Sequence, residues 1–355
     1  MSPRPYASLA LVLAASIARA QAAPTFPSTP WSRVGHVALP APTAGPLLPR
    51  RRGGAAAILG PAGAVAMIHP SGELVGAWGT DAGASPLAWW AGDETLHLTR
   101  GRDTLLSYSV DGGLRGSTRF ADSIAGGVEV DAGGDAIVSF RGASLLAAAR
   151  VDWTGAPQRG YDARGAWRPA TSAPCPDGRG GVWVGAGAGI VRLHPSERRV
   201  ALTSDVRALY PRAGGGLIAV APEAIFLVDV AGAVIARLSV DATVLDLAPR
   251  SDGGFAVMLQ TSPPALSLYD GAGALVARAP VSRSARSLTV DAADAVLVAS
   301  RSGELAVFDA RGAPRWTLSL PPSLRPPVIA LSPTCFAVAT EGAEFITLRA
   351  TEAAP

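Results

Sequence analysis

The sequence predicts an all-β fold, a β-propeller of about eight four-stranded antiparallel blades, with seven as the alternative blade count. Three observations predict it: a unit of about forty residues recurs, two kinds of tight turn alternate within each unit, and helical periodicity is nearly absent after the first 23 residues. A sandwich or a barrel does not require a whole four-stranded unit to recur. A propeller does, because each blade is one such sheet packed on its neighbours.

The first kind of turn is built on Asp-x-x-Gly between two apolar strands. Its clearest copies begin at Asp152, Asp229, Asp270 and Asp309. With weaker copies included, the markers fall at positions 69, 111, 152, 194, 229, 270 and 309, in steps of 35 to 42 residues. Glycine supplies a positive φ, and aspartate bonds to the backbone two residues further on, so each copy predicts a hairpin.

The second kind of turn is rich in glycine or aspartate and leads into a β-branched strand, as at 177–181 and 252–254. From Trp31 to Ala350 there are 320 residues, which fits eight units of about forty. The last unit, Phe336–Leu348, ends without an outer strand, and the segment Trp31–Leu39 can supply one. We therefore expect the N-terminal strand to close the ring and remove an exposed sheet edge.

Residues 1–23 have the pattern of a secretory signal peptide: Arg4, the short apolar stretch Leu9–Ile17, and small residues that offer cleavage sites up to Ala22. No later apolar run is long enough to span a membrane. We expect residues 24–355 to form a single propeller domain, monomeric, without a transmembrane segment, and periplasmic or secreted. All 31 basic residues are arginine, and a net charge of +3 spread along the chain does not predict nucleic-acid binding.

Residues 295–329 carry a family resemblance. The segment 301–316 (RSGELAVFDARGAPRW), followed by Pro326-Pro327-Val328, resembles the repeat of pyrroloquinoline-quinone-like (PQQ-like) propellers. That family includes quinoprotein dehydrogenases and a propeller subunit that assists outer-membrane protein assembly. The dehydrogenases use adjacent cysteines and a metal-ligating asparagine, and this chain has neither. The resemblance therefore implies the non-enzymatic, assembly-type propeller without the quinone site and without a cofactor, although the lipid-bearing cysteine of the assembly subunit is missing.

The residues that could perform chemistry do not form a known motif. Four histidines, His36, His69, His97 and His194, show no His-x-His or His-x-x-x-His spacing, so we expect no metal site. A Ser-His-Asp triad is compatible with the composition, but no Gly-x-Ser-x-Gly motif supports it, and we assign no catalytic residue. Trp89-Trp90 is expected in the core of an inner strand, with a stacking surface for a ligand as the alternative.

Four arginines recur in phase with the repeat and are the candidate binding residues. Arg168, Arg207, Arg286 and Arg325 are spaced by 39, 79 and 39 residues, which is one, two and one blade, and each precedes a predicted innermost strand. Guanidinium groups gathered at one mouth of the central channel would suit carboxylate or phosphate groups. The alternative is that an arginine-rich composition places arginine in loops without a role.

The function that follows is an exported, non-catalytic propeller that acts as a binding or protein-interaction scaffold in the cell envelope, with an envelope protein or an anionic ligand as the partner. The alternative is a propeller enzyme, of lyase or hydrolase type, with its site at the channel mouth. Cys175 and Cys335 fall about half a turn of the ring apart, beyond disulfide reach, so we expect two free thiols.

Overall fold

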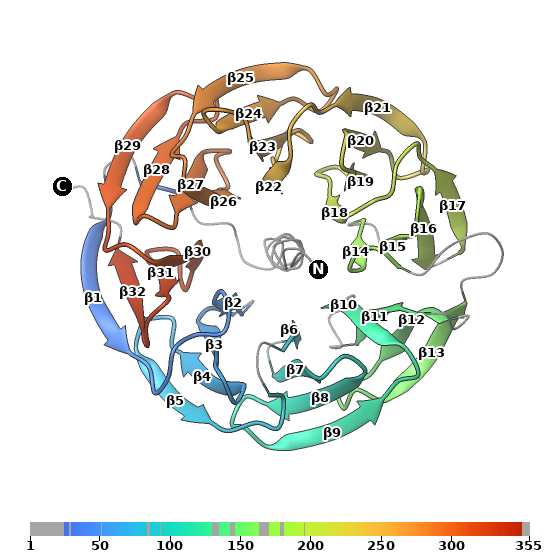
Figure 1. The fold of residues 1–355 in the computed structure, drawn as a ribbon, viewed down its shortest axis with the longest axis vertical. Coiled ribbons are helices and arrows are strands. Elements are labelled where there is room, and N and C mark those ends of the chain that lie inside the picture. The colour runs from blue at the N-terminus through green and yellow to red at the C-terminus, as the bar shows by residue number, and fades with distance from the viewer. Residues whose placement is uncertain are drawn as a thin grey trace, which may run out of the picture. The chain divides into compact units, whose positions relative to one another are not determined.

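The predicted fold is confirmed by the computed structural model, in which the described residues form eight four-stranded antiparallel sheets, the blades of an eight-bladed β-propeller (Figure 1). The structure describes residues 25–27, 30–50, 52–83, 86–92, 94–129, 135–142, 146–162, 170–177, 181–194 and 196–349. The expected signal peptide lies outside these ranges. Within them no helix is long and apolar enough to cross a membrane.

The chain divides into two compact units, each with four blades. Unit 1 lies within Pro86–Asp241. Its strands are, for blade 2, β6 (Ala88–Ala91), β7 (Thr95–Arg100), β8 (Thr104–Ser109) and β9 (Leu114–Arg119); for blade 3, β10 (Ser123–Glu129), β11 (Ala136–Arg141), β12 (Leu146–Val151) and β13 (Pro157–Asp162); for blade 4, β14 (Cys175–Pro176), β15 (Val182–Gly185), β16 (Gly189–His194) and β17 (Arg198–Ala201); for blade 5, β18 (Ala208–Pro211), β19 (Leu217–Val220), β20 (Ala224–Val228) and β21 (Val234–Ser239).

Unit 2 combines residues 25–83 with residues 242–349. Its strands are, for blade 1, β2 (Leu48–Pro49), β3 (Ala55–Leu59), β4 (Ala64–Ile68) and β5 (Leu74–Trp78); for blade 6, β22 (Val244–Pro249), β23 (Phe255–Leu259), β24 (Ala265–Tyr269) and β25 (Leu275–Pro280); for blade 7, β26 (Ala285–Val290), β27 (Val296–Ser300), β28 (Glu304–Phe308) and β29 (Pro314–Ser319); for blade 8, β30 (Leu324–Ala330), β31 (Cys335–Thr340), β32 (Glu344–Arg349) and β1 (Ser32–Ala38). We call the first strand of each blade the inner strand and the last the outer strand; in blade 8 these are β30 and β1.

The Asp-x-x-Gly turn closes the hairpin between the third and fourth strands of a blade. In blade 6, Asp270 N–H donates to Ala274 O at 2.9 Å, and Asp270 Oδ1 accepts from the N–H groups of Ala272 and Ala274. Gly273 has a φ of 86°, a conformation that glycine adopts without strain. In blade 2 the predicted marker Asp111 is wrong by two residues: Ser109 takes the place, and its Oγ accepts from Gly113 N–H at 3.0 Å.

The N-terminal segment completes blade 8, as predicted. β1 pairs antiparallel with β32, with Ser32 opposite Arg349 and Ala38 opposite Glu344. Figure 1 shows β1, in blue, along the outer side of the red β32. The edge of blade 8 is therefore covered by a strand from the opposite end of the chain.

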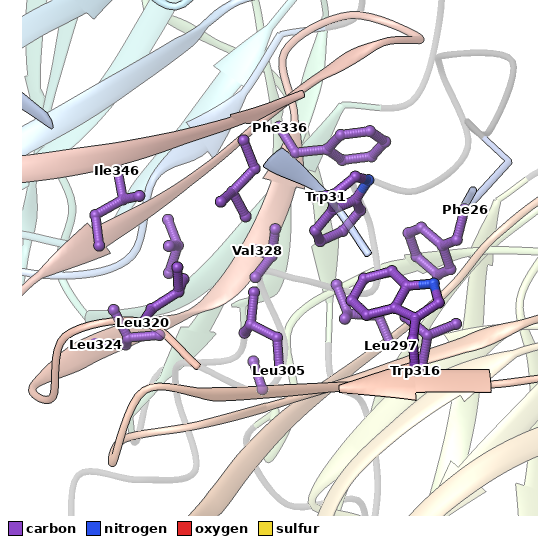
Figure 2. Close-up of a cluster of buried hydrophobic side chains, with 14 of the residues drawn as sticks. Phe26, Trp31, Leu297, Leu305, Trp316, Leu320, Leu324, Val328, Phe336 and Ile346 are labelled. Atoms are coloured by element: carbon purple, nitrogen blue, oxygen red, sulfur yellow. The ribbon is translucent and has the colours of Figure 1, made fainter. Parts of the chain in front are cut away.

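Aromatic side chains just before β1 pack between blades 7 and 8 (Figure 2). Trp31, 2% exposed, stacks on Phe336 of β31 with ring centroids 4.5 Å apart and meets Trp316 of β29 edge-on at 5.2 Å. Phe26 is 3% exposed and lies edge-on to Trp31 at 5.8 Å. Trp316 Nε1 donates to Pro27 O at 2.9 Å. The N-terminus is thus anchored by apolar burial as well as by strand pairing.

A buried carboxyl group joins the inner strands of blades 6 and 7. Asp246 of β22 is 4% exposed; its Oδ1 accepts from its neighbour Leu247 N–H at 2.9 Å, and its Oδ2 accepts from Leu288 N–H of β26 at 2.8 Å. Burial raises the pKa of Asp246 to about 7, although both backbone donors favour the charged form.

Replacing Trp31 with alanine is expected to destabilise the protein by about 3–5 kcal/mol, because it empties a fully packed site between two blades. Trp153, which is 51% exposed, provides the matched control, and Trp153→Ala should cost less than about 1 kcal/mol. Urea denaturation monitored by far-UV circular dichroism measures both changes in the free energy of unfolding. A Trp31→Ala protein that unfolds at the wild-type urea midpoint would contradict the anchoring role of Trp31.

Deletion of residues 24–39 should have a larger effect than the Trp31 substitution, because it exposes the edge of β32. We expect the deletion variant to aggregate on size-exclusion chromatography.

Asp246 is expected to weaken unit 2 as the pH rises. The pKa of Asp246 is about 7 in the folded protein and 3.8 in the unfolded chain, so the folded state binds the carboxyl proton more tightly. The stabilisation that this proton gives to the folded state is complete below pH 3.8 and is lost as the pH rises through 7. The difference in unfolding free energy between wild type and Asp246→Asn should therefore change by up to roughly 4 kcal/mol between pH 4 and pH 8. A pH-independent difference would show that Asp246 ionises normally in the folded protein.

Candidate functional site

Three of the four predicted arginines lie within the described residues, and Arg168 lies outside them. Arg207 immediately precedes β18, the inner strand of blade 5 in unit 1. Arg286 and Arg325 are the second residues of β26 and β30, the inner strands of blades 7 and 8 in unit 2. All three stand where the chain begins an inner strand, and the structure brings Arg286 and Arg325 onto neighbouring strands, because β26 and β30 pack side by side.

A bulge in the strand explains why Arg286 points away from the core. The pairing of β26 with β27 shifts register between Ala285 and Ser287, which leaves Arg286 unpaired and exposed between two buried residues. Its Nη1 donates to Ala285 O at 2.7 Å. Arg325 is half-buried, its Nη1 donates to Ala44 O at 3.2 Å, and its Nε is buried without a hydrogen-bond partner in the part of the chain that the structure describes.

The charge of these arginines is not neutralised within the described residues, where no carboxylate forms an ion pair with Arg207, Arg286 or Arg325. Backbone carbonyls accept single hydrogen bonds from two of them and leave the positive charge in place. A guanidinium has five donors in a planar fork that matches carboxylate and phosphate oxygens. Arg286 and Arg325 therefore keep guanidinium donors that no described carboxylate occupies.

A serine–histidine pair that sequence reasoning missed lies in unit 1. His97 Nδ1 and Ser107 Oγ, on the paired strands β7 and β8, are 2.8 Å apart, and both residues are 0% exposed. Burial lowers the pKa of His97 to about 4, against the opposing effect of the Asp152 carboxylate, so the imidazole is neutral at pH 7. Gly155 packs over the pair, since a Cβ on it would lie 2.6 Å from Ser107 Oγ. The pair is therefore fully buried in the structure.

The other histidines lie apart in the structure. His36 of β1 contacts Glu344 at 3.0 Å, and His69 Nδ1 lies 2.9 Å from Ser71 Oγ in a hairpin turn. His194 ends β16. Over the described ranges, no three His, Cys, Asp or Glu side chains gather as a metal site would require.

The remaining sequence candidates are buried. Cys175 and Cys335 are each buried, lie in different units, and are not joined by a disulfide. Burial raises the pKa of the Cys335 thiol, which makes it a poor nucleophile. Trp89 and Trp90 lie in β6 and are 4% and 8% exposed, so the expected core position is confirmed.

No family model and no curated protein sequence matches the chain. Solved β-propeller structures do match. BamB from Moraxella catarrhalis has a TM-score of 0.67 and 14% identity over 92% of this chain and 100% of its own. The Dos1 propeller has a TM-score of 0.67 and 10% identity over 90% of this chain and 95% of its own. Virginiamycin B lyase from Staphylococcus aureus has a TM-score of 0.52 and 10% identity over 89% of this chain and 99% of its own. At such low identity these likenesses show the β-propeller fold alone.

Proposed function

We propose that this chain is an exported, non-catalytic binding scaffold of the cell envelope that takes an acidic segment of a partner protein, or another anionic ligand, on its inner-strand arginines. The observation that supports it most is the uncompensated charge of Arg286 and Arg325 on the neighbouring strands β26 and β30. Arg207, and Arg168 by its phase in the repeat, extend the same pattern to further blades. The proposed contacts are charge-assisted hydrogen bonds, which are the strong kind.

Export is proposed from the first 23 residues, which combine a positive start, a short apolar stretch and small residues. The sequence resemblance to propellers that assist outer-membrane protein assembly points to the same compartment. The structural likeness to BamB agrees with a propeller of that architecture.

The alternative is a propeller enzyme of lyase or hydrolase type. The likeness to virginiamycin B lyase, including a catalytically inactive variant with quinupristin, shows that an eight-bladed chain of this kind has structural neighbours among enzymes. In this protein the Ser107–His97 pair is fully enclosed, and an acyl-transfer step needs an exposed nucleophile. The uncompensated charge of Arg286 and Arg325 supports binding better than the described residues support catalysis.

The arginine proposal is tested with residues 24–355 and a fluorescein-labelled hexaglutamate peptide as the acidic probe, by fluorescence anisotropy at several salt concentrations. Arg286→Ala with Arg325→Ala should weaken binding about tenfold or more, because each charge-assisted hydrogen bond contributes about 1.5–3 kcal/mol. The same double variant should flatten the dependence of the dissociation constant on salt. Arg168→Ala with Arg207→Ala tests the other two positions in the same way.

The matched control is Arg278→Ala with Arg315→Ala, which removes the same charge from two exposed positions on the outer strands β25 and β29. It should leave the affinity within about twofold of wild type. Equal loss in the two double variants would show that the probe responds only to net charge and would overturn the assignment to the inner strands.

A further inference from the structure

A cavity of about 350 Å³ lies between blades 6 and 7 of unit 2. Blade 6 contributes the end of β25 and the segment that leaves it, Ala279 to Ser282, and blade 7 contributes residues of β27, β28 and β29. Val298, Ala306 and Phe308 form its apolar side, and they belong to the hydrophobic cluster that these two blades share. The volume is at the small end of the range for ligand pockets, about 300–1,000 Å³.

Glu304 is the ionisable side chain of the lining. It is half-buried at the start of β28, and its carboxylate makes no ion pair or hydrogen bond within the described residues; its backbone N–H donates to Ser300 Oγ at 2.9 Å. A carboxylate beside an apolar surface is stabilised by a cation that brings its own apolar part, because the pair is then shielded from water.

A glutamate is not required at the place of Glu304, although blade 8 also has one there, Glu344, which pairs with Ala38 and contacts His36 at 3.0 Å. The first residue of the third strand is Ala224 in blade 5 and Ala265 in blade 6, paired with Ser239 and Pro280 in the same register that pairs Glu304 with Ser319. The backbone frame therefore accepts alanine at this place. The carboxylate of blade 7 is not needed to form the strand.

Hydroxyl groups add a polar rim next to Glu304. Ser282 and Ser300 line the cavity and are linked through Ser284 and Ser302 by three Oγ–Oγ contacts of 3.1, 2.7 and 2.9 Å. Three hydrogen bonds among four hydroxyl groups use three of their four protons, which leaves one for another acceptor. The rim can therefore donate to a polar substituent of a molecule whose cationic group faces Glu304.

We propose that this cavity binds a small amphipathic amine, with its ammonium group at Glu304 and its apolar part against Val298, Ala306 and Phe308. The inference is independent of the inner-strand arginines, which select the opposite charge. The cavity lies between the outer parts of two blades, and a ligand there contacts both blade 6 and blade 7.

The test uses residues 24–355 and three probes of nearly the same shape: 2-phenylethylamine, its neutral analogue 2-phenylethanol, and the anion 3-phenylpropionate. Isothermal titration calorimetry should give a dissociation constant below about 1 mM for the amine. We expect at least about tenfold weaker binding of the alcohol and no binding of the carboxylate, since only the ammonium group pairs with Glu304.

Two variants locate the site. Glu304→Gln should remove the preference for amine over alcohol, and Ala306→Met should abolish binding of both by filling the cavity. Glu341→Gln, at an exposed position of blade 8, is the control for the loss of one negative charge and should bind the amine as wild type does. Circular dichroism melts verify that each variant is folded. Equal affinity of wild type for amine and alcohol, an unchanged amine affinity in Glu304→Gln, or no binding of any probe at 10 mM would each overturn the proposal.

Discussion

Blade 8 depends on a segment that is more than 300 residues away from it in the sequence. Its strands β30, β31 and β32 follow one another, but its fourth strand is β1, and the pairing of Ser32 with Arg349 joins residues 317 positions apart. Aligning such distant segments costs loop-closure entropy before any contact is made. The aromatic contacts of Trp31 with Phe26, Trp316 and Phe336 supply compensating apolar burial at the same place. Strand pairing and side-chain packing here are therefore one cooperative feature (Figure 2).

Two buried titratable groups give the units opposite responses to pH. His97 in unit 1 has a folded pKa of about 4, below its ordinary value of 6.5, so its contribution to stability is present above pH 6.5 and is lost as the pH falls through 4. Asp246 in unit 2 has a raised pKa, and its contribution is lost as the pH rises through 7. The physical cause is the same for both, because burial favours the neutral form of either group. The fold thus contains one acid-sensitive and one base-sensitive position at contacts between strands.

The sequence analysis succeeded where local chemistry determines local structure. Asp-x-x-Gly turns, the steps of about forty residues and the incomplete last repeat predicted the blades and the partner of β32, since each depends on residues a few positions apart or on a simple count. It failed at Asp111, because serine can cap the same turn as aspartate and Ser109 does so in blade 2. It also missed the Ser107–His97 pair and the cavity at Glu304. Those arise from side chains on different strands, whose meeting depends on register and on the packing of one blade on the next.

The repeated frame makes departures from the repeat more informative than the repeat itself. β22 and β26 have the same bulge, and it presents Leu245 in blade 6 and Arg286 in blade 7 at one backbone position. The third strand begins with Ala265 in blade 6 and with Glu304 in blade 7. Both residues pair in the same register with the outer strand, so the strand pairing does not require a charged side chain at this position. Blade 7 differs from blade 6 at both places. Blade 8 also begins its third strand with a glutamate, Glu344, but that carboxylate contacts His36. A propeller blade can in this way carry side chains of opposite charge at two places without altering the fold.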